Sequence, residues 1–271
     1  MKERILVAAI GLPLLVVMLL WLPVPVTAGV LSLLSAIAVH ELLYVTGLLR
    51  SVRITAVSMA MAVFVCVWSY FGMLALPMQI AAVVFVVYLF AELLAANTRL
   101  DFANLCLALF AAVVLPYCLS AVTRILCMES GRALALLPFV MTMVPDSGAF
   151  FVGCACGKHK LAPQISPHKT VEGVVGGIVT GILGMLLYAL ILQSCGFRVN
   201  YLYAAVYGLL GAGGSTLGDL AFSTVKRQHG IKDFGNLLPG HGGVLDRFDS
   251  TMVVAPLAEL LLILIPFAVM L

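Results

Sequence analysis

Carboxylates and cations suited to phosphate chemistry gather between Asp219 and Asp249 of this 271-residue chain. Asp219, Asp246 and Asp249 supply hard oxygen ligands of the kind that Mg²⁺ prefers. The cations of the same stretch are Lys226, Arg227, Lys232 and Arg247. Such cations neutralise phosphate oxygens, and arginine can bind them through two parallel hydrogen bonds. Carboxylates for a metal ion beside cations for phosphates predict phosphoryl or nucleotidyl transfer.

The spacing of these residues predicts which of them share a helix face. Asp219 and Ser223 are four residues apart, and Lys226 falls near the same face one turn later. Asp246 and Asp249 are three apart, so a short helix there would point both carboxylates the same way. We therefore expect one helix face that runs from acid to hydroxyl to cation, followed by a second pair of acids.

Glycines interrupt the stretch and predict a loop. His241, Gly242 and Gly243 form a predicted turn whose bare backbone can approach a phosphate closely. The alternative is a solvated loop on the positively charged side of a membrane. That alternative explains the lysines and arginines, but not the aspartates and glycines packed among them.

Asp146 is a further candidate because it lies inside an apolar run. An ionisable residue within a membrane span costs about 2.5–3.5 kcal/mol on insertion scales, so it is a functional candidate by default. Pro145 frees a backbone carbonyl, and Gly148 is expected to keep the site open. We expect a broken helix here, which membranes tolerate only where the chain lines a cavity.

A second polar loop covers residues 154–170. Ser166 and Thr170 are candidate helix caps, and Glu172 lies near a predicted helix start. Lysines such as Lys169 suit either a membrane surface or a phosphate site. Taken with the 219–249 stretch, this loop is a candidate second wall of one site.

The elements that must position these residues are membrane-spanning helices. The chain is 63% hydrophobic and only 10% charged, with a mean hydropathy of +1.16. Apolar runs near 20 residues recur from end to end, which is the length that crosses a bilayer. We predict an all-α polytopic integral membrane protein. Its nine predicted transmembrane helices are 5–24, 27–48, 54–75, 79–97, 103–123, 133–153, 171–193, 201–224 and 252–270.

The distribution of basic residues predicts the orientation of these spans. With the N-terminus in the cytoplasm, inside segments hold twelve of the fifteen Lys and Arg residues and outside segments hold three. The C-terminus is then outside, and the loops 154–170 and 225–251 are both cytoplasmic. We treat 1–271 as a single transmembrane domain, in which 1–130 is mainly scaffold and 131–271 carries the catalytic spans and loops.

Glycine spacing predicts close helix packing. Gly173, Gly177 and Gly181 recur every four residues on one face, which lets another helix backbone approach. The glycines before Asp219 suit either tight packing or room for a bulky headgroup. For two acids near predicted cytoplasmic ends, Glu41 and Glu92, a functional role and interfacial snorkelling are equally compatible with the sequence.

The polar stretch and its neighbouring segments resemble those of a known family. The 223–249 stretch is similar to the signature of phosphatidate cytidylyltransferases, also called CDP-diglyceride synthases. Every specified position of that signature is met: Ser223, Val225, Lys226, Arg227, Lys232, Asp233, Gly235, Leu238, Pro239, His241, Gly242, Gly243, Val244, Asp246, Arg247 and Asp249. The segments 146–149 and 166–173 also fit, so the resemblance spans about 146–250. Two departures are His168, where the family usually has Gly, and Cys154, where it often has a basic residue.

The resemblance implies that CTP and phosphatidate give CDP-diacylglycerol and pyrophosphate. Together with the residue chemistry, it assigns Mg²⁺ to Asp219, Asp246 and Asp249, with Asp146 completing a polar cavity or holding a second metal ion. The residues expected to hold the triphosphate and pyrophosphate are Lys226, Arg227, Lys232 and Arg247. Those expected to bind the lipid phosphate or the nucleotide are Ser166 and Lys169. Those expected to shape the turn or complete the catalytic set are His241, Gly242, Gly243, Ser223 and Asp233.

The expected partners are CTP, phosphatidate and membrane lipids, with no nucleic acid. A homodimer is implied by the resemblance alone. The expected location is a bacterial inner membrane, with the active site facing the cytoplasm.

Two other function classes remain open to the sequence. An ion-coupled transporter would use Asp146 and Asp219 as midplane acids, but it predicts inverted repeats, which the chain does not display. A CDP-alcohol phosphotransferase would carry a multi-aspartate helix pattern, which is absent here. A purely structural membrane subunit would not need the residues of 223–249.

Overall fold

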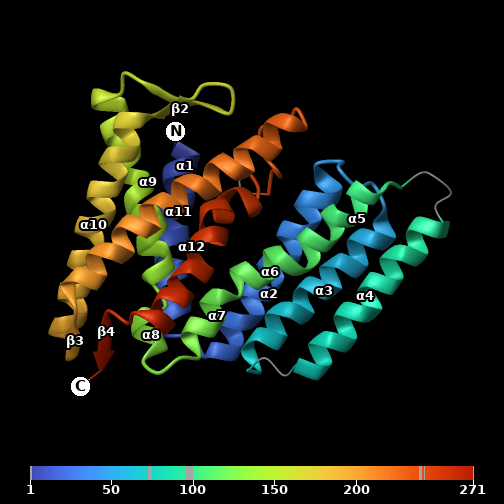
Figure 1. The fold of residues 1–271 in the computed structure, drawn as a ribbon, viewed down its shortest axis with the longest axis horizontal. Coiled ribbons are helices and arrows are strands. Elements are labelled where there is room, and N and C mark those ends of the chain that lie inside the picture. Colours follow the sequence, from blue (N-terminus) through green and yellow to red (C-terminus); the bar gives the residue numbers. More distant parts are fainter. Residues whose placement is uncertain (1, 73–74, 96–99, 238–239, 241, 271) are drawn as a thin grey trace. The chain divides into compact units, whose positions relative to one another are not determined.

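The computed structural model of the chain describes residues 2–72, 75–95, 100–237, 240 and 242–270, with side chains described from residue 11 onward. Helices dominate the described residues, as predicted (Figure 1). The chain folds into two compact units. The first unit comprises Met1–Cys127 and Ile231–Phe248. The second unit comprises Met128–Gly230 and Asp249–Leu271.

The first unit contains most of the N-terminal helices. They are α1 (Lys2–Leu20), α2 (Val24–His40), η1 (Glu41–Val45), α3 (Val52–Tyr70), α4 (Ala75–Ala95), α5 (Phe102–Leu109), η2 (Phe110–Val114), α6 (Leu115–Leu119) and α7 (Ala121–Leu126). The elements η1 and η2 are π-helical turns that directly follow α2 and α5. Helix α3 packs against α2, α4 and α6. Small buried side chains such as Ser35, Ala38 and Ala62 allow these helices to approach closely.

The first unit joins two segments that lie far apart in the sequence. Residues 231–248 contain much of the signature. In the structure they belong to the same unit as the N-terminal helices. The N-terminal part therefore does more than support the spans, because it holds the loop that leads into the last helix.

The second unit contains five helices and two short ribbons. They are α8 (Gly131–Leu134), α9 (Leu137–Cys156), β1 (Lys160–Ala162), β2 (Ser166–Thr170), α10 (Val171–Ser194), β3 (Phe197–Val199), α11 (Tyr201–Gln228), α12 (Leu245–Leu264) and β4 (Ala268–Met270). Helix α12 begins in the first unit and continues in the second. Strands β1 and β2 pair antiparallel, as do β3 and β4. The prediction of an all-α chain missed these ribbons because three- to five-residue strands leave too little periodicity to detect.

Glycines join α10 to its neighbours at backbone distance, which confirms the predicted packing. A β-carbon at Gly177 would lie 3.0 Å from the carbonyl oxygen of Pro145 on α9. A β-carbon at Gly208 on α11 would lie 2.6 Å from the carbonyl oxygen of Gly181. Helix α10 thus packs against both α9 and α11, as Figure 1 shows. Of the glycines before Asp219, Gly208 serves this packing, whereas a β-carbon added at Gly213 would meet no neighbouring element within 4 Å.

Two predictions about α9 are wrong. The helix continues unbroken from Leu137 to Cys156 although Pro145 lies inside it. A proline inside a helix loses one hydrogen bond and can be accommodated by bending, so it need not end the helix. Gly148 does not keep the site open either. A β-carbon there would overlap the Thr180 hydroxyl oxygen, so this glycine is required by the contact with α10.

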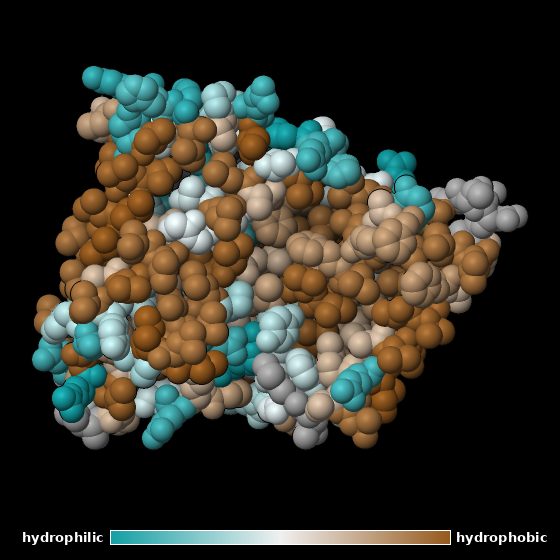
Figure 2. Space-filling view, viewed as in Figure 1, coloured by the Kyte–Doolittle hydropathy of each residue, from teal (hydrophilic) through white to brown (hydrophobic). Residues whose placement is uncertain are grey.

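Six helical segments of the described residues are long and apolar enough to cross a membrane. They are Val24–Val45, Val52–Tyr70, Ala75–Ala95, Phe102–Leu126, Gly131–Cys156 and Val171–Ser194. Apolar side chains cover much of the visible face, and hydrophilic ones gather at the β1–β2 end of α9 and α10 (Figure 2). These apolar helices indicate a membrane protein. The predicted last span, 252–270, is displaced in the structure, because α12 occupies 245–264 and β4 follows it.

Candidate active site

Asp219, Lys169 and Ser223 form a polar cluster in the second unit. The Nζ atom of Lys169 lies 2.5 Å from Oδ2 of Asp219. The Ser223 hydroxyl donates to Oδ1 of Asp219 at 3.3 Å, which confirms the predicted helix face. Both partners of the ion pair are partly exposed, at 23% for Lys169 and 33% for Asp219. A carboxylate, a hydroxyl and an ammonium group are thus brought together where solutes can reach them.

The position of Lys169 follows from the β1–β2 hairpin and the start of α10. Thr170 caps α10, because its hydroxyl accepts from the Gly173 N–H at 3.1 Å. The strand β2 ends at this cap, so Lys169 is held directly before the helix. Arg227 at the end of α11 donates from Nε to the Ile165 carbonyl at 3.3 Å, which ties the hairpin to α11. Ser166, predicted as a helix cap, lies in β2 instead.

Asp146 joins the same helix face through a residue that the sequence analysis missed. The Ser215 hydroxyl donates to Oδ1 of Asp146 at 2.7 Å. Ser215 is buried on α11 and precedes Asp219 by four residues, one helical turn. The spacing of Ser215, Asp219 and Ser223, each four apart, is a signal that the sequence contained. It extends the polar face of α11 by one turn beyond the predicted start.

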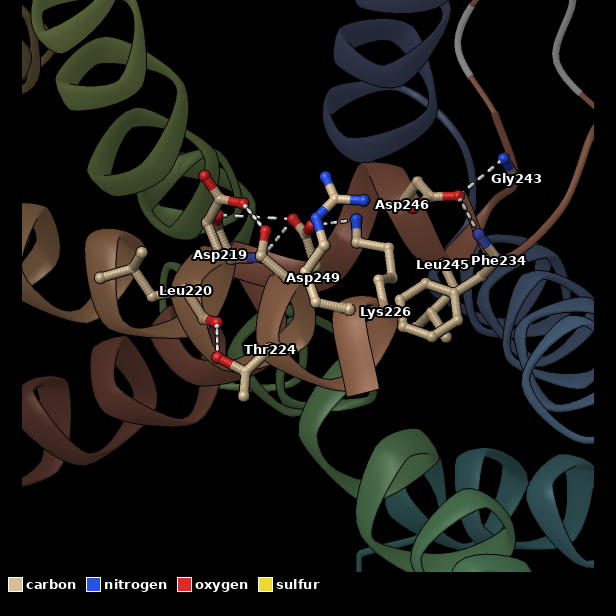
Figure 3. A network of polar contacts seen from close by, with 12 residues as sticks. Asp219, Leu220, Thr224, Lys226, Phe234, Gly243, Leu245, Asp246 and Asp249 are labelled. Atoms are coloured by element: carbon tan, nitrogen blue, oxygen red, sulfur yellow. Dashed lines mark hydrogen bonds and ion pairs between the residues drawn. The ribbon is translucent and has the colours of Figure 1, made fainter. Parts of the chain in front are cut away.

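Lys226 and Asp249 form a second, more buried pair in the same unit. Lys226 Nζ lies 3.8 Å from Asp249 Oδ2, and the two residues are only 8% and 9% exposed. Oδ1 of Asp249 accepts from the Ser250 N–H at 2.7 Å. Helices α11 and α12 approach closely here, because a β-carbon at Gly218 would lie 3.0 Å from the Asp249 carbonyl oxygen. Figure 3 shows the carboxylates of Asp219 and Asp249 and the amine of Lys226.

Asp246 is held within the first unit by the loop before α12. Its Oδ2 atom accepts from the N–H groups of Phe234 at 2.8 Å and Gly243 at 3.0 Å (Figure 3). Gly242 adopts φ +79°, a conformation that favours glycine. In this arrangement the Gly243 N–H is directed at a carboxylate of the protein itself. Phosphate binding by Gly242 and Gly243 stays a prediction.

The predicted helical spacing of Asp246 and Asp249 is confirmed, because both lie in the first turns of α12. Lys232, Asp233 and Arg247 are exposed, as groups that meet a soluble nucleotide would be. His241 lies outside the described residues. Glu41, which the sequence left undecided, is buried in the first unit and accepts two hydrogen bonds from the backbone at the start of α12.

The acids of the site suit a magnesium ion that is shared with a substrate. Among the described residues, no three His, Cys, Asp or Glu side chains gather as a ready-made metal centre. Magnesium is usually held by one or two protein carboxylates, with waters and substrate phosphates completing its six ligands. The acids offered here carry only oxygen donors, and lysines balance the charge of Asp219 and Asp249. The donor set therefore fits Mg²⁺ in the presence of phosphates.

Comparison with known proteins identifies the family of the chain. The chain matches the Cytidylyltransferase family over residues 2–265. The phosphatidate cytidylyltransferase of Staphylococcus saprophyticus is 33% identical over 275 residues, which cover 97% of this chain and 99% of that protein. That of Bacillus subtilis strain 168 is 48% identical over 119 residues, or 44% of this chain and 43% of that protein. That of Staphylococcus aureus strain COL is 43% identical over 136 residues, covering 50% and 51%.

Proposed function

Because the chain belongs to the cytidylyltransferase family, an enzyme family, we propose that it transfers the cytidylyl group of CTP to phosphatidate. The products are CDP-diacylglycerol and pyrophosphate. The observation that carries the proposal is the cluster of Asp219, Lys169 and Ser223, beside the pair of Lys226 and Asp249. The full-length similarity to a protein named phosphatidate cytidylyltransferase supports the choice of substrates.

The proposed reaction joins two anions. A phosphate oxygen of phosphatidate attacks the α-phosphorus of CTP, a new P–O bond forms, and the bond to the β-phosphate oxygen breaks. The electron pair of that bond leaves with pyrophosphate. Since the attacking phosphate is already ionised, it needs no strong general base. The main requirement is to bring anions together in line and to stabilise the leaving group.

The cations of the chain meet this requirement in the proposal. Lys169 is placed to exchange its contact with Asp219 for a phosphate oxygen of a substrate. Lys226 and Arg227, at the end of α11, neutralise the triphosphate in this proposal. Lys232 and Arg247 are exposed cations of the 231–248 segment and have the same proposed role. Ser223 orients the Asp219 carboxylate through its hydrogen bond.

We also propose that Asp219, Asp246 and Asp249 hold Mg²⁺, with Asp146 completing the polar cavity or holding a second metal ion. When bound, the metal ion would neutralise phosphate charge and stabilise the departing pyrophosphate. The metal role is best supported for Asp219, because its carboxylate is partly exposed and lies beside a lysine. Two backbone N–H groups donate to Oδ2 of Asp246 and hold its carboxylate at the start of α12.

The proposed membrane arrangement keeps nine spans, a cytoplasmic N-terminus and an external C-terminus. Two contacts within the second unit support it. Pairing of β3 with β4 brings the end of the chain beside the α10–α11 connection, and the predicted topology puts both outside. The bond from Arg227 to Ile165 joins two segments that the topology puts inside. The 28 residues of α11 are about 42 Å long, enough to cross a bilayer.

This topology places the reaction at the cytoplasmic face of a bacterial inner membrane, where CTP is available and phosphatidate arrives from the bilayer. Membrane lipids surround the spans, and a homodimer is proposed from family resemblance. Incubation of purified protein with phosphatidate and each of the four nucleoside triphosphates, with and without Mg²⁺, tests the function. We expect pyrophosphate release with CTP and Mg²⁺ only. Equal release with all four nucleotides, or release without phosphatidate, would contradict the proposal.

A further inference from the structure

Glu41 is a buried acid of the N-terminal helices that contacts the signature loop. It lies where α2 ends and the π-helical turn η1 begins, and only 3% of its surface is exposed. A π-helical turn inserts an extra residue into a helix and re-aims the side chains around it, and such turns are frequent at functional sites. A carboxylate so deeply buried is costly unless its oxygens accept hydrogen bonds.

Those hydrogen bonds come from residues that lie 203 and 204 positions later in the chain. Oε1 of Glu41 accepts from the Val244 N–H at 2.9 Å, and Oε2 accepts from the Leu245 N–H at 2.9 Å. Leu245 is the first residue of α12. The first N–H groups of a helix have no partner within the helix, and the helix dipole favours a negative charge beside them. Glu41 thus caps α12 although 203 positions separate it from Val244.

The glycines of the signature loop make room for this carboxylate. A β-carbon at Gly235 would overlap Oε1 of Glu41, and one at Gly243 would overlap Oε2. No side chain can be accommodated at either position without displacing Glu41. The bare backbone at Gly235 and Gly243 thus packs directly against the Glu41 carboxylate.

The turn that Glu41 caps is the one that carries the acids. Asp246 follows Leu245 directly, and its Oδ2 holds the N–H groups of Phe234 and Gly243. Asp249 follows one turn later on the same helix. The loop and the first turn of α12 are therefore fixed by two carboxylates, Glu41 from the N-terminal helices and Asp246 from α12 itself.

We propose that Glu41 is a positioning residue for the nucleotidyl transfer. It fixes the direction and register of the first turn of α12, and so sets where the carboxylates of Asp246 and Asp249 point. It touches neither substrate nor metal ion. The inference rests on the proposed function, since it is the metal role of these aspartates that makes their orientation matter.

Glu41→Gln is the first test, because it keeps the size of the side chain but turns one acceptor into an NH₂ group that faces a backbone donor. Supporting groups of metal sites typically contribute about 10–100-fold in metal affinity or activity. We expect kcat per folded molecule to fall by about that factor, and the Mg²⁺ concentration for half-maximal activity to rise severalfold. The matched control is Glu129→Gln, at an exposed acid outside the signature, which we expect to change neither quantity.

A double-mutant cycle separates the Glu41 contact from a phosphate role of the loop. Gly235→Ala in the natural sequence should lower kcat on the order of 10–100-fold, because its methyl group meets the Glu41 carboxylate. In a Glu41→Ala background the same methyl group enters vacated space, so Gly235→Ala should cause little further loss. Gly213→Ala, where a β-carbon meets nothing within 4 Å, is the steric control in both backgrounds.

Amide hydrogen exchange gives a readout that does not depend on activity. Glu41→Gln should raise exchange at Val244 and Leu245 and leave Gly173, capped by Thr170, unchanged. The proposal is overturned if Glu41→Gln keeps the natural kcat and Mg²⁺ dependence per folded molecule, or if the losses from Glu41→Ala and Gly235→Ala simply multiply. If instead the natural protein makes no CDP-diacylglycerol, the proposed function fails, and exchange at Val244 and Leu245 still reports on the cap.

Discussion

Substitution of Lys169 by Met should lower turnover strongly while leaving the fold intact. The change keeps an unbranched side chain that is one atom shorter and removes the charge that lies 2.5 Å from Asp219 Oδ2. A hydrogen bond to a charged group contributes about 1.5–3 kcal/mol, and each 1.4 kcal/mol is a factor of ten. If Lys169 makes one such bond to a substrate phosphate in the transition state, kcat/KM should fall by about 10–150-fold.

The assay is CDP-diacylglycerol formation by purified protein in mixed micelles, with the folded fraction measured by gel filtration. Lys160→Met is the matched control, because Lys160 lies on the neighbouring strand β1 and is exposed. Its effect should stay within about twofold, as for an ordinary surface substitution. Lys169→Met with activity equal to that of Lys160→Met would refute the assignment of Lys169 to the site.

Three further predictions concern the second unit. Asp219→Asn should abolish Mg²⁺-dependent turnover and leave the protein folded; near-normal CDP-diacylglycerol formation would contradict the metal assignment. Gly208→Ala should destabilise the protein by about 1–3 kcal/mol, seen as a lower Tm, because its β-carbon would lie 2.6 Å from the Gly181 carbonyl oxygen. Thr170→Ala should remove the cap of α10 and lower stability by about 1 kcal/mol, measured by denaturant titration; an unchanged midpoint would contradict the capping role.

The sequence predicted those features of the site that depend on local spacing. Asp219 and Ser223 share a helix face because they are four residues apart on α11, and their hydrogen bond confirms this. Asp246 and Asp249 lie in the first turns of a helix, as their spacing indicated. The glycine spacing of α10 likewise predicted close packing, because a four-residue repeat keeps the same face in contact over several turns.

Features that depend on contacts between distant residues were not accessible in the same way. Nothing local to Glu41 indicates that its carboxylate caps a helix that starts at Leu245. Pro145 illustrates the opposite error, because a local rule predicted a break where packing of α9 against α10 keeps the helix continuous. Ser215 was detectable from its spacing to Asp219, but a serine in a glycine-rich run resembles a simple packing residue.

The most direct test of the account follows the phosphorus atoms of CTP. Purified protein is incubated with phosphatidate, Mg²⁺ and CTP that is radiolabelled at either the α- or the γ-phosphate. We predict that the α-label appears in the lipid product and that the γ-label appears only in pyrophosphate. When phosphatidate is omitted, neither labelled product should form. Transfer of the γ-label to lipid, or labelling of lipid without loss of pyrophosphate from CTP, would contradict nucleotidyl transfer as the reaction of this chain.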